Sequence, residues 1–153
     1  MTGPSLVLAR ESPRQDAVRR LLEALDAYQS ALYPAESNHF LDVDALSAPN
    51  VRFFVARLAG EAVGCGALRI DQGWGELKRM YVTPAARGHR IGRSILERIE
   101  AEARAAGLDC LRLETGIRQP EALALYRSAG YVERAAFGAY APDPLSVFME
   151  KIL

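Results

Sequence analysis

A helix-like segment between two strand-like runs is the feature that most constrains the fold of this chain. In residues 93–107, RSILERIEAEARAAG, apolar side chains recur at helical spacing, and Glu100 and Arg104 stand four residues apart, as an ion pair on a helix would. The flanking runs WGELKRMYV (74–82) and DCLRLET (109–115) are rich in strand-forming residues. The expected buried face of the helix carries Ile91, Ile95, Ile99, Ala103 and Ala106. Such a pattern requires a sheet on which the helix packs.

Strand-like and helix-like segments alternate through the rest of the chain as well. A helix is expected over 12–32, with Ser12 as its N-cap and Gln15 completing a capping box. The other expected elements are a strand at 5–10, a loop with a short helix at 33–50, a hairpin at 51–70, a helix at 119–130, and strands at 131–138 and 145–153. The order predicts a mixed α/β (or α+β) sheet with helices packed on it.

Length and composition indicate one soluble domain spanning residues 1–153. The chain has 19 lysines and arginines against 19 aspartates and glutamates, which argues against nucleic acid as the main partner. Cys65 and Cys110 lie in apolar runs and are interpreted as buried free thiols of a reducing compartment, and two histidines are too few for a metal site. The N-terminal residues contain no long apolar stretch, so we expect no signal peptide, no membrane partner and a cytoplasmic location.

The stretch ARGHRIGRSIL, residues 86–96, has the features of an anion-binding helix start. Unpaired backbone N–H groups at a helix N-terminus attract phosphates, and the glycines Gly88 and Gly92 would let a phosphate approach the backbone. Arg87, Arg90 and Arg93 would add charge-assisted contacts. The stretch matches neither a Walker loop nor a dinucleotide fingerprint. Taken alone, it is equally compatible with a basic helix start that holds no ligand.

The residues around this stretch carry a resemblance to a known family. The segments ELKRMYVTPAARGHRIGRSIL, LRLETG and QPEALALYRSAGYVE together resemble the GNAT superfamily of acyl-CoA-dependent N-acetyltransferases over nearly the whole chain. The family motif Q/R-x-x-G-x-G/A is matched by Arg87 and Gly92, but Arg90 replaces its middle glycine. Gln119 and Tyr131 likewise replace the usual Asn and Phe. The segments LYPAESNH, GELKRMYV and ETGIRQPEA are similar to a bacterial subgroup of these proteins whose substrate the family does not settle.

The resemblance implies a fold and a cofactor site. The fold would be a mixed, mostly antiparallel sheet of about six to seven strands, with a splayed parallel pair at its centre and helices on both faces. Acetyl-CoA would be the co-substrate, without a metal. Its pantetheine arm would pair with the backbone of Met80, Tyr81 and Val82, and the Met80 N–H would polarise the thioester carbonyl. The other cofactor residues implied are Arg87, Gly88, His89, Arg90, Ile91, Gly92, Arg93 and Gln119.

The resemblance also implies two catalytic side chains. Glu76 stands eleven residues before Arg87, the interval of the catalytic glutamate in the histone-type enzymes, and would act as the base. The alternative is a solvated charge at a strand end, or a carboxylate that only binds a substrate cation. Tyr126 matches the usual general acid, and the alternative for it is an aromatic ring packed on the sheet.

Two aromatic and polar segments are candidates for the acceptor pocket of a small-molecule amine. They contribute Tyr28, Tyr33, Glu36, His39 and Tyr140, with His39 as an alternative base. Glu36 with Glu76 would favour a cationic amine, whereas Arg52 or Arg79 would hold a carboxylate. The sequence does not choose the acceptor, and exposed edge strands would permit a homodimer.

Two other functions are compatible with the same residues. One is an acyl-CoA-binding sensor module without transfer activity, since Arg90 and Gln119 depart from the family motif. The other is a phosphate site for a nucleotide, unrelated to acyl transfer. Binding of acetyl-CoA without turnover would favour the sensor, and binding of ATP but not of coenzyme A would favour the nucleotide site.

Overall fold

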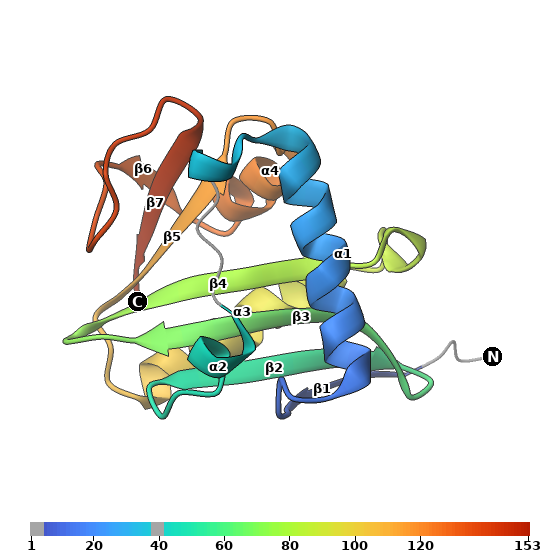
Figure 1. Cartoon of the computed structure of the whole chain (residues 1–153). Helices are drawn as coiled ribbons and strands as arrows, with labels where there is room; N and C mark the ends of the chain where they lie inside the picture. Colours follow the sequence, from blue (N-terminus) through green and yellow to red (C-terminus); the bar gives the residue numbers. More distant parts are fainter. Residues whose placement is uncertain (1–4, 38–41) are drawn as a thin grey trace.

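Strands and helices alternate in the structure as the sequence pattern predicts. The structure is a computed structural model that describes residues 5–37 and 42–153 (Figure 1). The strands are β1 (Leu6–Arg10), β2 (Val51–Leu58), β3 (Glu61–Ile70), β4 (Trp74–Val82), β5 (Cys110–Gly116), β6 (Val132–Arg134) and β7 (Ser146–Ile152). The helices are α1 (Asp16–Leu32), α2 (Val43–Leu46), α3 (Ile91–Ala105) and α4 (Pro120–Ser128), with short 3-10 turns η1 (Ala35–Ser37) and η2 (Pro84–Ala86). In this described part of the chain, no helix has the length and apolarity needed to cross a bilayer.

The strands form a single sheet that divides at its centre. Their order is β1-β2-β3-β4-β5-β7-β6, and every neighbouring pair is antiparallel except β4 with β5. The parallel pairing runs from Trp74 opposite Cys110 to Leu77 opposite Leu113. Beyond that point β4 continues to Val82 and β5 to Gly116 while the strands diverge (Figure 1). The expected mixed sheet with a splayed parallel pair is confirmed.

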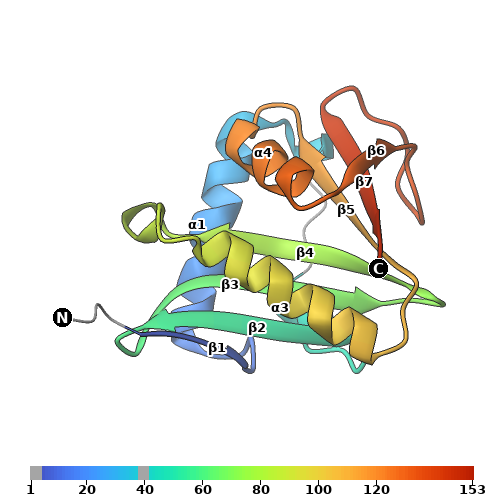
Figure 2. The same cartoon turned by 180° about the vertical axis from the view of Figure 1, so that it is seen from behind.

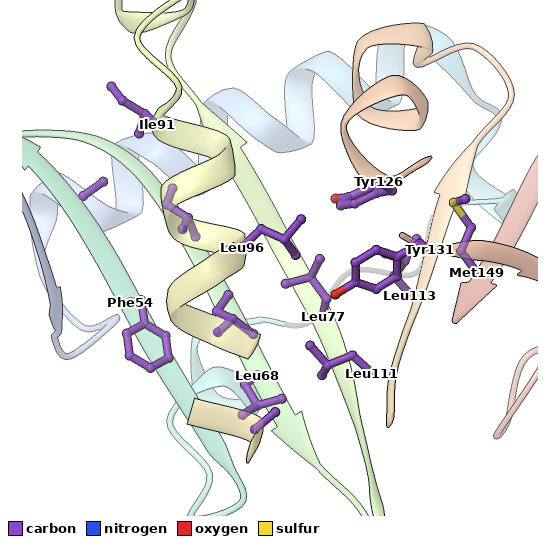
Figure 3. Packing of buried hydrophobic residues seen from close by; sticks show 14 of the residues in the cluster. Phe54, Leu68, Leu77, Ile91, Leu96, Leu111, Leu113, Tyr126, Tyr131 and Met149 are labelled. Atoms are coloured by element: carbon purple, nitrogen blue, oxygen red, sulfur yellow. The ribbon is translucent and has the colours of Figure 1, made fainter. Parts of the chain in front are cut away.

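Helices cover both faces of the sheet because its central strands are apolar on both sides. Along β2, Phe53 and Val55 pack against one helix layer, and Phe54 packs against the other. The first layer is α1 with α2, and the second is α3 with α4 (Figures 1 and 2). The buried face of α3 carries Ile91, Ile95, Ile99 and Ala103, as its periodicity predicts, and belongs to the same apolar cluster as Leu68, Leu111, Leu113 and Met149 (Figure 3). Each isoleucine, leucine or methionine side chain removed from water here contributes about 1.5–3 kcal/mol.

A bulge interrupts β4 just after its last pairing with β5, at Leu77. The register of β3 with β4 shifts between Cys65 and Ala67, so that Arg79 and Met80 face the single residue Gly66. Arg79 takes a left-handed backbone with φ of 58°. A Cβ on Gly66 would come within 2.8 Å of the Met80 sulfur, so glycine is what lets the bulge fit against α3. The bulge changes the direction of the backbone at Met80, where β4 and β5 are no longer paired.

The start of α1 differs from the prediction. The helix begins at Asp16 with Gln15 in an extended conformation, not with Ser12 as N-cap. The Ser12 hydroxyl accepts a hydrogen bond from the Arg14 N–H (3.0 Å), and the Gln15 amide donates to the Ser12 carbonyl (2.8 Å). These contacts form a local turn before the helix, so the expected capping box is wrong.

The expected pair of Glu100 with Arg104 is also wrong. In the part of the chain described, Glu100 is 5% exposed and its partners are Tyr131, whose hydroxyl donates at 2.9 Å, and Lys151 at 3.1 Å. The carboxylate therefore bridges α3 to Tyr131, just before β6, and to Lys151 of β7, instead of pairing along the helix surface. The C-terminal strand supplies the neutralising charge, which no local spacing could predict.

Candidate active site

A groove opens where β4 and β5 diverge. Its volume is about 490 Å³, and its walls come from β4, the start of α3, α4 and one turn of α1. Here it is called the outer groove, and its lining residues are Leu25, Tyr28, Met80, Tyr81, Val82, Arg87, Gly88, Arg90, Ile91, Gly92, Arg93, Gln119, Glu121, Ala122, Leu125 and Tyr126. All the residues expected to hold acetyl-CoA are among them except His89, which is exposed nearby. Because β4 has no partner strand on this side beyond Leu77, its backbone can hydrogen bond to a ligand.

The start of α3 forms the cationic end of the outer groove. The first-turn N–H groups of the helix, at Ile91, Gly92 and Arg93, have no partner within the helix. The preceding turn is left-handed at Gly88 (φ 90°) and at Arg90 (φ 59°), which is the N-cap. Arg93 donates to the Ser128 hydroxyl of α4 at 2.9 Å, so its guanidinium spans the groove from one helix to the other. This end can therefore bind an anion through backbone N–H groups and charge together.

A second, smaller cavity lies deeper between the diverging strands. It measures about 100 Å³ and is called the inner pocket. It shares Leu25, Met80, Gln119, Ala122 and Tyr126 with the outer groove. Its other lining residues are Gln29, Tyr33, Ser37, Glu76, Leu77, Lys78, Arg79, Glu114, Thr115, Gly116, Tyr140, Leu145 and Ser146. Met80 and Tyr126 thus stand at the junction of the two spaces.

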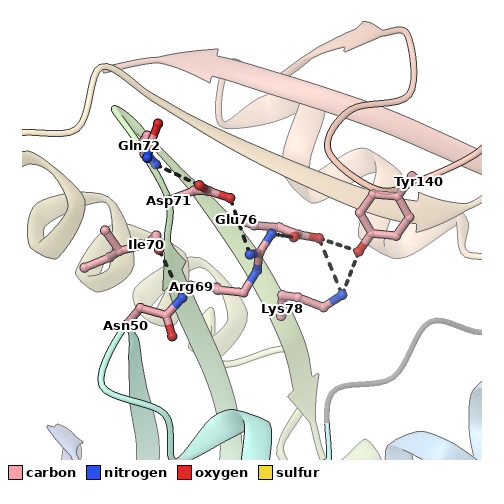
Figure 4. A network of polar contacts seen from close by, with 8 residues as sticks. All are labelled: Asn50, Arg69, Ile70, Asp71, Gln72, Glu76, Lys78 and Tyr140. Atoms are coloured by element: carbon pink, nitrogen blue, oxygen red, sulfur yellow. Dashed lines mark hydrogen bonds and ion pairs between the residues drawn. The ribbon is translucent and has the colours of Figure 1, made fainter.

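Glu76 is enclosed on the wall of the inner pocket. Its side chain is 2% exposed. The Arg69 guanidinium donates to Oε1 at 2.9 Å and the Tyr140 hydroxyl donates to Oε2 at 2.5 Å (Figure 4). The Lys78 ammonium lies 3.5 Å from Oε2 and donates to the Tyr140 oxygen at 2.6 Å. The alternative of a solvated carboxylate at a strand end is therefore wrong, because two cations and a phenol surround Glu76.

Lys78 and Glu114 are site residues that the sequence analysis missed. Lys78 is 11% exposed and lies two residues after Glu76, so strand alternation places both side chains on one face of β4. Lys78 could therefore have been predicted from the alternation of side chains along the strand. Glu114 lies on β5 and accepts from the Ser146 hydroxyl at 2.7 Å. Its presence in the inner pocket depends on where β5 diverges, which the sequence does not encode locally.

Tyr126 lines both the outer groove and the inner pocket. The side chain is 7% exposed, its ring packs edge-on against Tyr131, and no group within residues 5–37 or 42–153 hydrogen bonds to its oxygen. Figure 3 shows the ring above the core side chains of α3 and β4. Burial raises the pKa of the hydroxyl well above its usual value, so it is a neutral hydrogen-bond donor at physiological pH.

The expected acceptor tyrosines take different positions. The Tyr33 hydroxyl donates to Gln119 at 3.2 Å and accepts from the Arg118 N–H at 3.1 Å, and it lies directly over Gly116. Burial raises the pKa of Tyr33, and its ring joins α1 to the β5–α4 turn at the wall of the inner pocket. Tyr28 lines the outer groove, and Tyr140 lines the inner pocket.

The candidate carboxylate ligands and the acidic loop have a mixed outcome. Arg52 pairs with Glu102 of α3 at 2.9 Å and is not among the residues lining the inner pocket, so it cannot hold an acceptor there. Arg79 does line the inner pocket, and it pairs with Asp26 of α1 at 2.6 Å. His39 lies outside the described residues, as does the side chain of Glu36.

An anion-binding groove joined to a polar inner pocket is the arrangement expected of a group-transfer protein. The sequence profile of the Acetyltransferase (GNAT) family matches residues 17–131. The chain belongs to the GNAT family of N-acetyltransferases. Members of this family use acetyl-CoA and act on amine acceptors.

Individual relatives agree with the family. A protein named IAA acetyltransferase from Azospirillum brasilense is 60% identical over 152 residues, which cover 98% of this chain and 99% of the relative. A structure of a Klebsiella pneumoniae protein, described as an acyl-CoA N-acyltransferase, is 42% identical with a TM-score of 0.83 and 97% coverage of both chains. The PaiA N-acetyltransferase of Thermoplasma acidophilum, solved in complex with coenzyme A, shares the fold at a TM-score of 0.74 and 17% identity, over 97% of this chain and 99% of that one.

Proposed function

We propose that this protein transfers the acetyl group of acetyl-CoA to a primary amine of a small molecule, with both substrates bound at once. The observation that carries the proposal is the junction at Met80 and Tyr126. There the outer groove, whose cationic end would bind phosphate, meets the inner pocket, whose wall includes the buried carboxylate of Glu76. The outer groove has the volume of a typical cofactor site, whereas the inner pocket of about 100 Å³ suits only a small acceptor group.

The outer groove supplies contacts for each part of acetyl-CoA. The N–H groups of residues 88–93 and the guanidinium groups of Arg87, Arg90 and Arg93 would hold the pyrophosphate. The free edge of β4 at Met80, Tyr81 and Val82 would pair with the amides of the pantetheine arm. Gln119, whose side chain accepts from the Tyr33 hydroxyl, would position the same arm from the α4 side.

The reaction needs a base, an oxyanion donor and a group at the leaving sulfur. Glu76 would take the proton of the acceptor ammonium, which has no lone pair until it loses that proton. The amine nitrogen then attacks the thioester carbon, and the Met80 N–H stabilises the negative oxygen. When the C–S bond breaks, the electron pair leaves on sulfur as a thiolate, and the second proton that nitrogen loses in becoming an amide would pass to this sulfur or to water. The Tyr126 hydroxyl would hydrogen bond to the sulfur.

The raised pKa of Tyr126 limits what this hydroxyl can do. An ordinary thiol has a pKa of about 8.5, so full transfer of the phenol proton to the thiolate is uphill. Tyr126 is therefore expected to act mainly by hydrogen bonding to the sulfur as charge develops there. This predicts a smaller catalytic contribution from Tyr126 than from Glu76.

A second function, an acyl-CoA-binding sensor, is favoured by one observation. Arg90 occupies the motif position of a glycine and holds a left-handed backbone there, so the pyrophosphate site differs from the family pattern. A protein that binds acetyl-CoA but transfers nothing to any amine would fit this function.

The experiment compares wild-type protein with Glu76→Gln. Acetyl-CoA binding is measured by calorimetric titration, with coenzyme A and ATP as controls, and transfer by thiol release with a panel of amines. The panel contains 2-phenylethylamine, glycine, 2-aminoethylphosphonate and spermidine, and IAA is assayed beside these amines because a close relative is named for it. We expect Glu76→Gln to lower turnover by about 10²-fold or more and to leave acetyl-CoA affinity unchanged.

Each other outcome has a distinct meaning. Wild-type turnover by Glu76→Gln would remove Glu76 from the mechanism. Tight binding of acetyl-CoA without transfer to any compound of the panel would favour the sensor. No binding of acetyl-CoA to folded protein would contradict the proposed role of the outer groove.

A further inference from the structure

Glu76, the proposed base, has little room to contact a substrate directly. Among the residues that the structure describes, its partners are Arg69 on Oε1 and both Tyr140 and Lys78 on Oε2 (Figure 4). With 2% of its side chain exposed, an ammonium could reach the carboxylate only by displacing one of these groups. The proton is therefore expected to pass through one of the partners.

Only one of the three partners can both accept and donate a proton. The Arg69 guanidinium and the Lys78 ammonium are donors without a lone pair, so neither can take a proton from a second ammonium. A tyrosine hydroxyl has one donor proton and an oxygen that can accept another. The Tyr140 hydroxyl already donates to Glu76 Oε2 at 2.5 Å, and its side chain lines the inner pocket.

We propose that the Tyr140 hydroxyl meets the acceptor amine and relays its proton to Glu76; this inference rests on the proposed function. In the step, one N–H proton of the ammonium moves to the Tyr140 oxygen while the phenol proton moves to Glu76 Oε2. The phenol is regenerated, the carboxylate becomes a carboxylic acid, and the amine becomes neutral and nucleophilic. No oxidant or additional reactant is required.

The surroundings of Tyr140 hold the hydroxyl in place. Its ring packs against Phe137 at 5.2 Å and Phe148 at 5.5 Å between centroids, which fixes the loop between β6 and β7 over β4. The Lys78 ammonium donates to the same oxygen from the pocket side at 2.6 Å. An acceptor ammonium offers the same N–H donors as Lys78, so it can replace the Lys78 ammonium on that oxygen at the cost of one hydrogen bond, while Lys78 keeps its ion pair with Glu76.

The charged groups around Tyr140 keep it in the protonated form that a relay needs. Burial raises the pKa of the hydroxyl, and the carboxylates of Glu76 and Glu114 raise it further, whereas Arg69 opposes them. A phenol that stays protonated at neutral pH cannot serve as a phenolate base. It can exchange protons in a concerted step, because its hydrogen bond to Glu76 is already formed.

The test is Tyr140→Phe, which keeps the ring packing with Phe137 and Phe148 and removes only the hydroxyl. With the best amine of the panel above, we expect kcat to fall by about 10²-fold near neutral pH, with no change in KM for acetyl-CoA. The deficit should shrink as the pH rises through the pKa of the amine, because a neutral amine has no proton to relay. A merely structural loss would not follow the pKa of the substrate.

Tyr33→Phe is the matched comparison. Its hydroxyl also lies at the inner pocket, but it bonds to Gln119 and the Arg118 backbone and not to Glu76. Any loss in Tyr33→Phe should therefore be constant with pH. Thermal unfolding of both variants checks that they fold.

The remaining outcomes separate the relay from the proposed function. If wild-type protein and Tyr140→Phe acetylate amines equally well while Glu76→Gln does not, the relay is wrong and the base acts directly or through water. A deficit in Tyr140→Phe that does not change with pH would also overturn the relay. If wild-type protein acetylates no amine, both the proposed function and the relay are contradicted.

Discussion

At the scale of single residues, Arg90 combines an unfavourable backbone with a useful charge. It is the N-cap of α3 with φ of 59°, a left-handed conformation that costs a residue with a Cβ about 1–2 kcal/mol. The side chain is exposed and lines the outer groove, so its guanidinium can approach a phosphate there. Arg90 therefore lowers the stability of the fold somewhat but places a positive charge at the anion site.

Substitution of Arg90 separates the two effects. Arg90→Gly should stabilise the fold by about 1 kcal/mol and raise Tm by about 2–4 °C, because glycine takes this conformation without strain. Arg90→Ala keeps the strained backbone and should not raise Tm. Both variants should bind acetyl-CoA more weakly than wild type, as measured by calorimetric titration at low salt. An equal gain in Tm for Arg90→Ala would show that strain is not the cause.

At the scale of elements, the first turn of α3 is shaped for close approach of a ligand. Gly92 is the second residue of the helix, and a Cβ there would lie 3.5 Å from a Leu125 methyl and 3.8 Å from a Val82 methyl, which are ordinary contacts. The protein itself therefore leaves room for alanine at this position. Glycine is therefore needed at this position only if a ligand occupies the space beside the backbone.

Gly92→Ala tests the phosphate site through opposite effects on folding and binding. Alanine in a helix is more favourable than glycine, so we expect a gain in stability of about 0.5–1 kcal/mol in thermal or denaturant unfolding. Acetyl-CoA affinity should fall at least about tenfold, equivalent to about 1.4 kcal/mol, because the methyl group obstructs the backbone N–H groups. Gly88→Ala is the contrast, since its left-handed φ of 90° predicts lost stability whether or not a ligand binds. Unchanged affinity in Gly92→Ala would mean that the phosphates lie elsewhere.

The β6–β7 region shows how tertiary contacts change an element. Residues 131–138 read as a strand, but only Val132–Arg134 pair with β7. Phe137 is 4% exposed and packs against Trp74 and Phe148, which turns the chain out of the sheet. The resulting loop brings Tyr140 over Glu76, so the local strand propensity gives way to an aromatic cluster that builds the site.

At the scale of the whole molecule, buried neutral acids make the fold sensitive to alkali. Burial raises the pKa of the Cys65 thiol from 9.0 to about 12, and burial also raises the pKa of Tyr126, Tyr131 and Tyr140. Each group stays protonated in the folded state at a pH at which it ionises in the unfolded chain. The stability that each contributes is complete below its unfolded pKa and is lost as the pH rises towards its folded pKa.

The free energy of unfolding should therefore decline from about pH 9 upward, first through the thiols and then through the tyrosines. Cys65→Ala isolates one contribution. It lowers the absolute stability by leaving a small cavity, but between pH 9 and 10 it should make the decline shallower by about 1 kcal/mol per pH unit. Denaturant unfolding of both proteins over this range measures the difference. Parallel pH profiles would show that the Cys65 thiol does not control the decline.

What the sequence alone determined is the set of elements and the residues governed by local periodicity. The buried face of α3, the order of strands and helices, and the basic, glycine-containing turn before α3 follow from spacing within a few residues. Lys78 belongs with these, since it lies two residues from Glu76 on the same strand.

Only the tertiary structure decided which of these residues meet. The Glu76–Tyr140 contact joins residues 64 apart, and the Glu100–Lys151 pair joins residues 51 apart. The first depends on how the loop between β6 and β7 packs on Phe137 and Phe148, and the second on the position of β7 beside β5. Backbone pairing and close packing across the whole sheet fix those two features, and no segment of the chain specifies them by its own propensity.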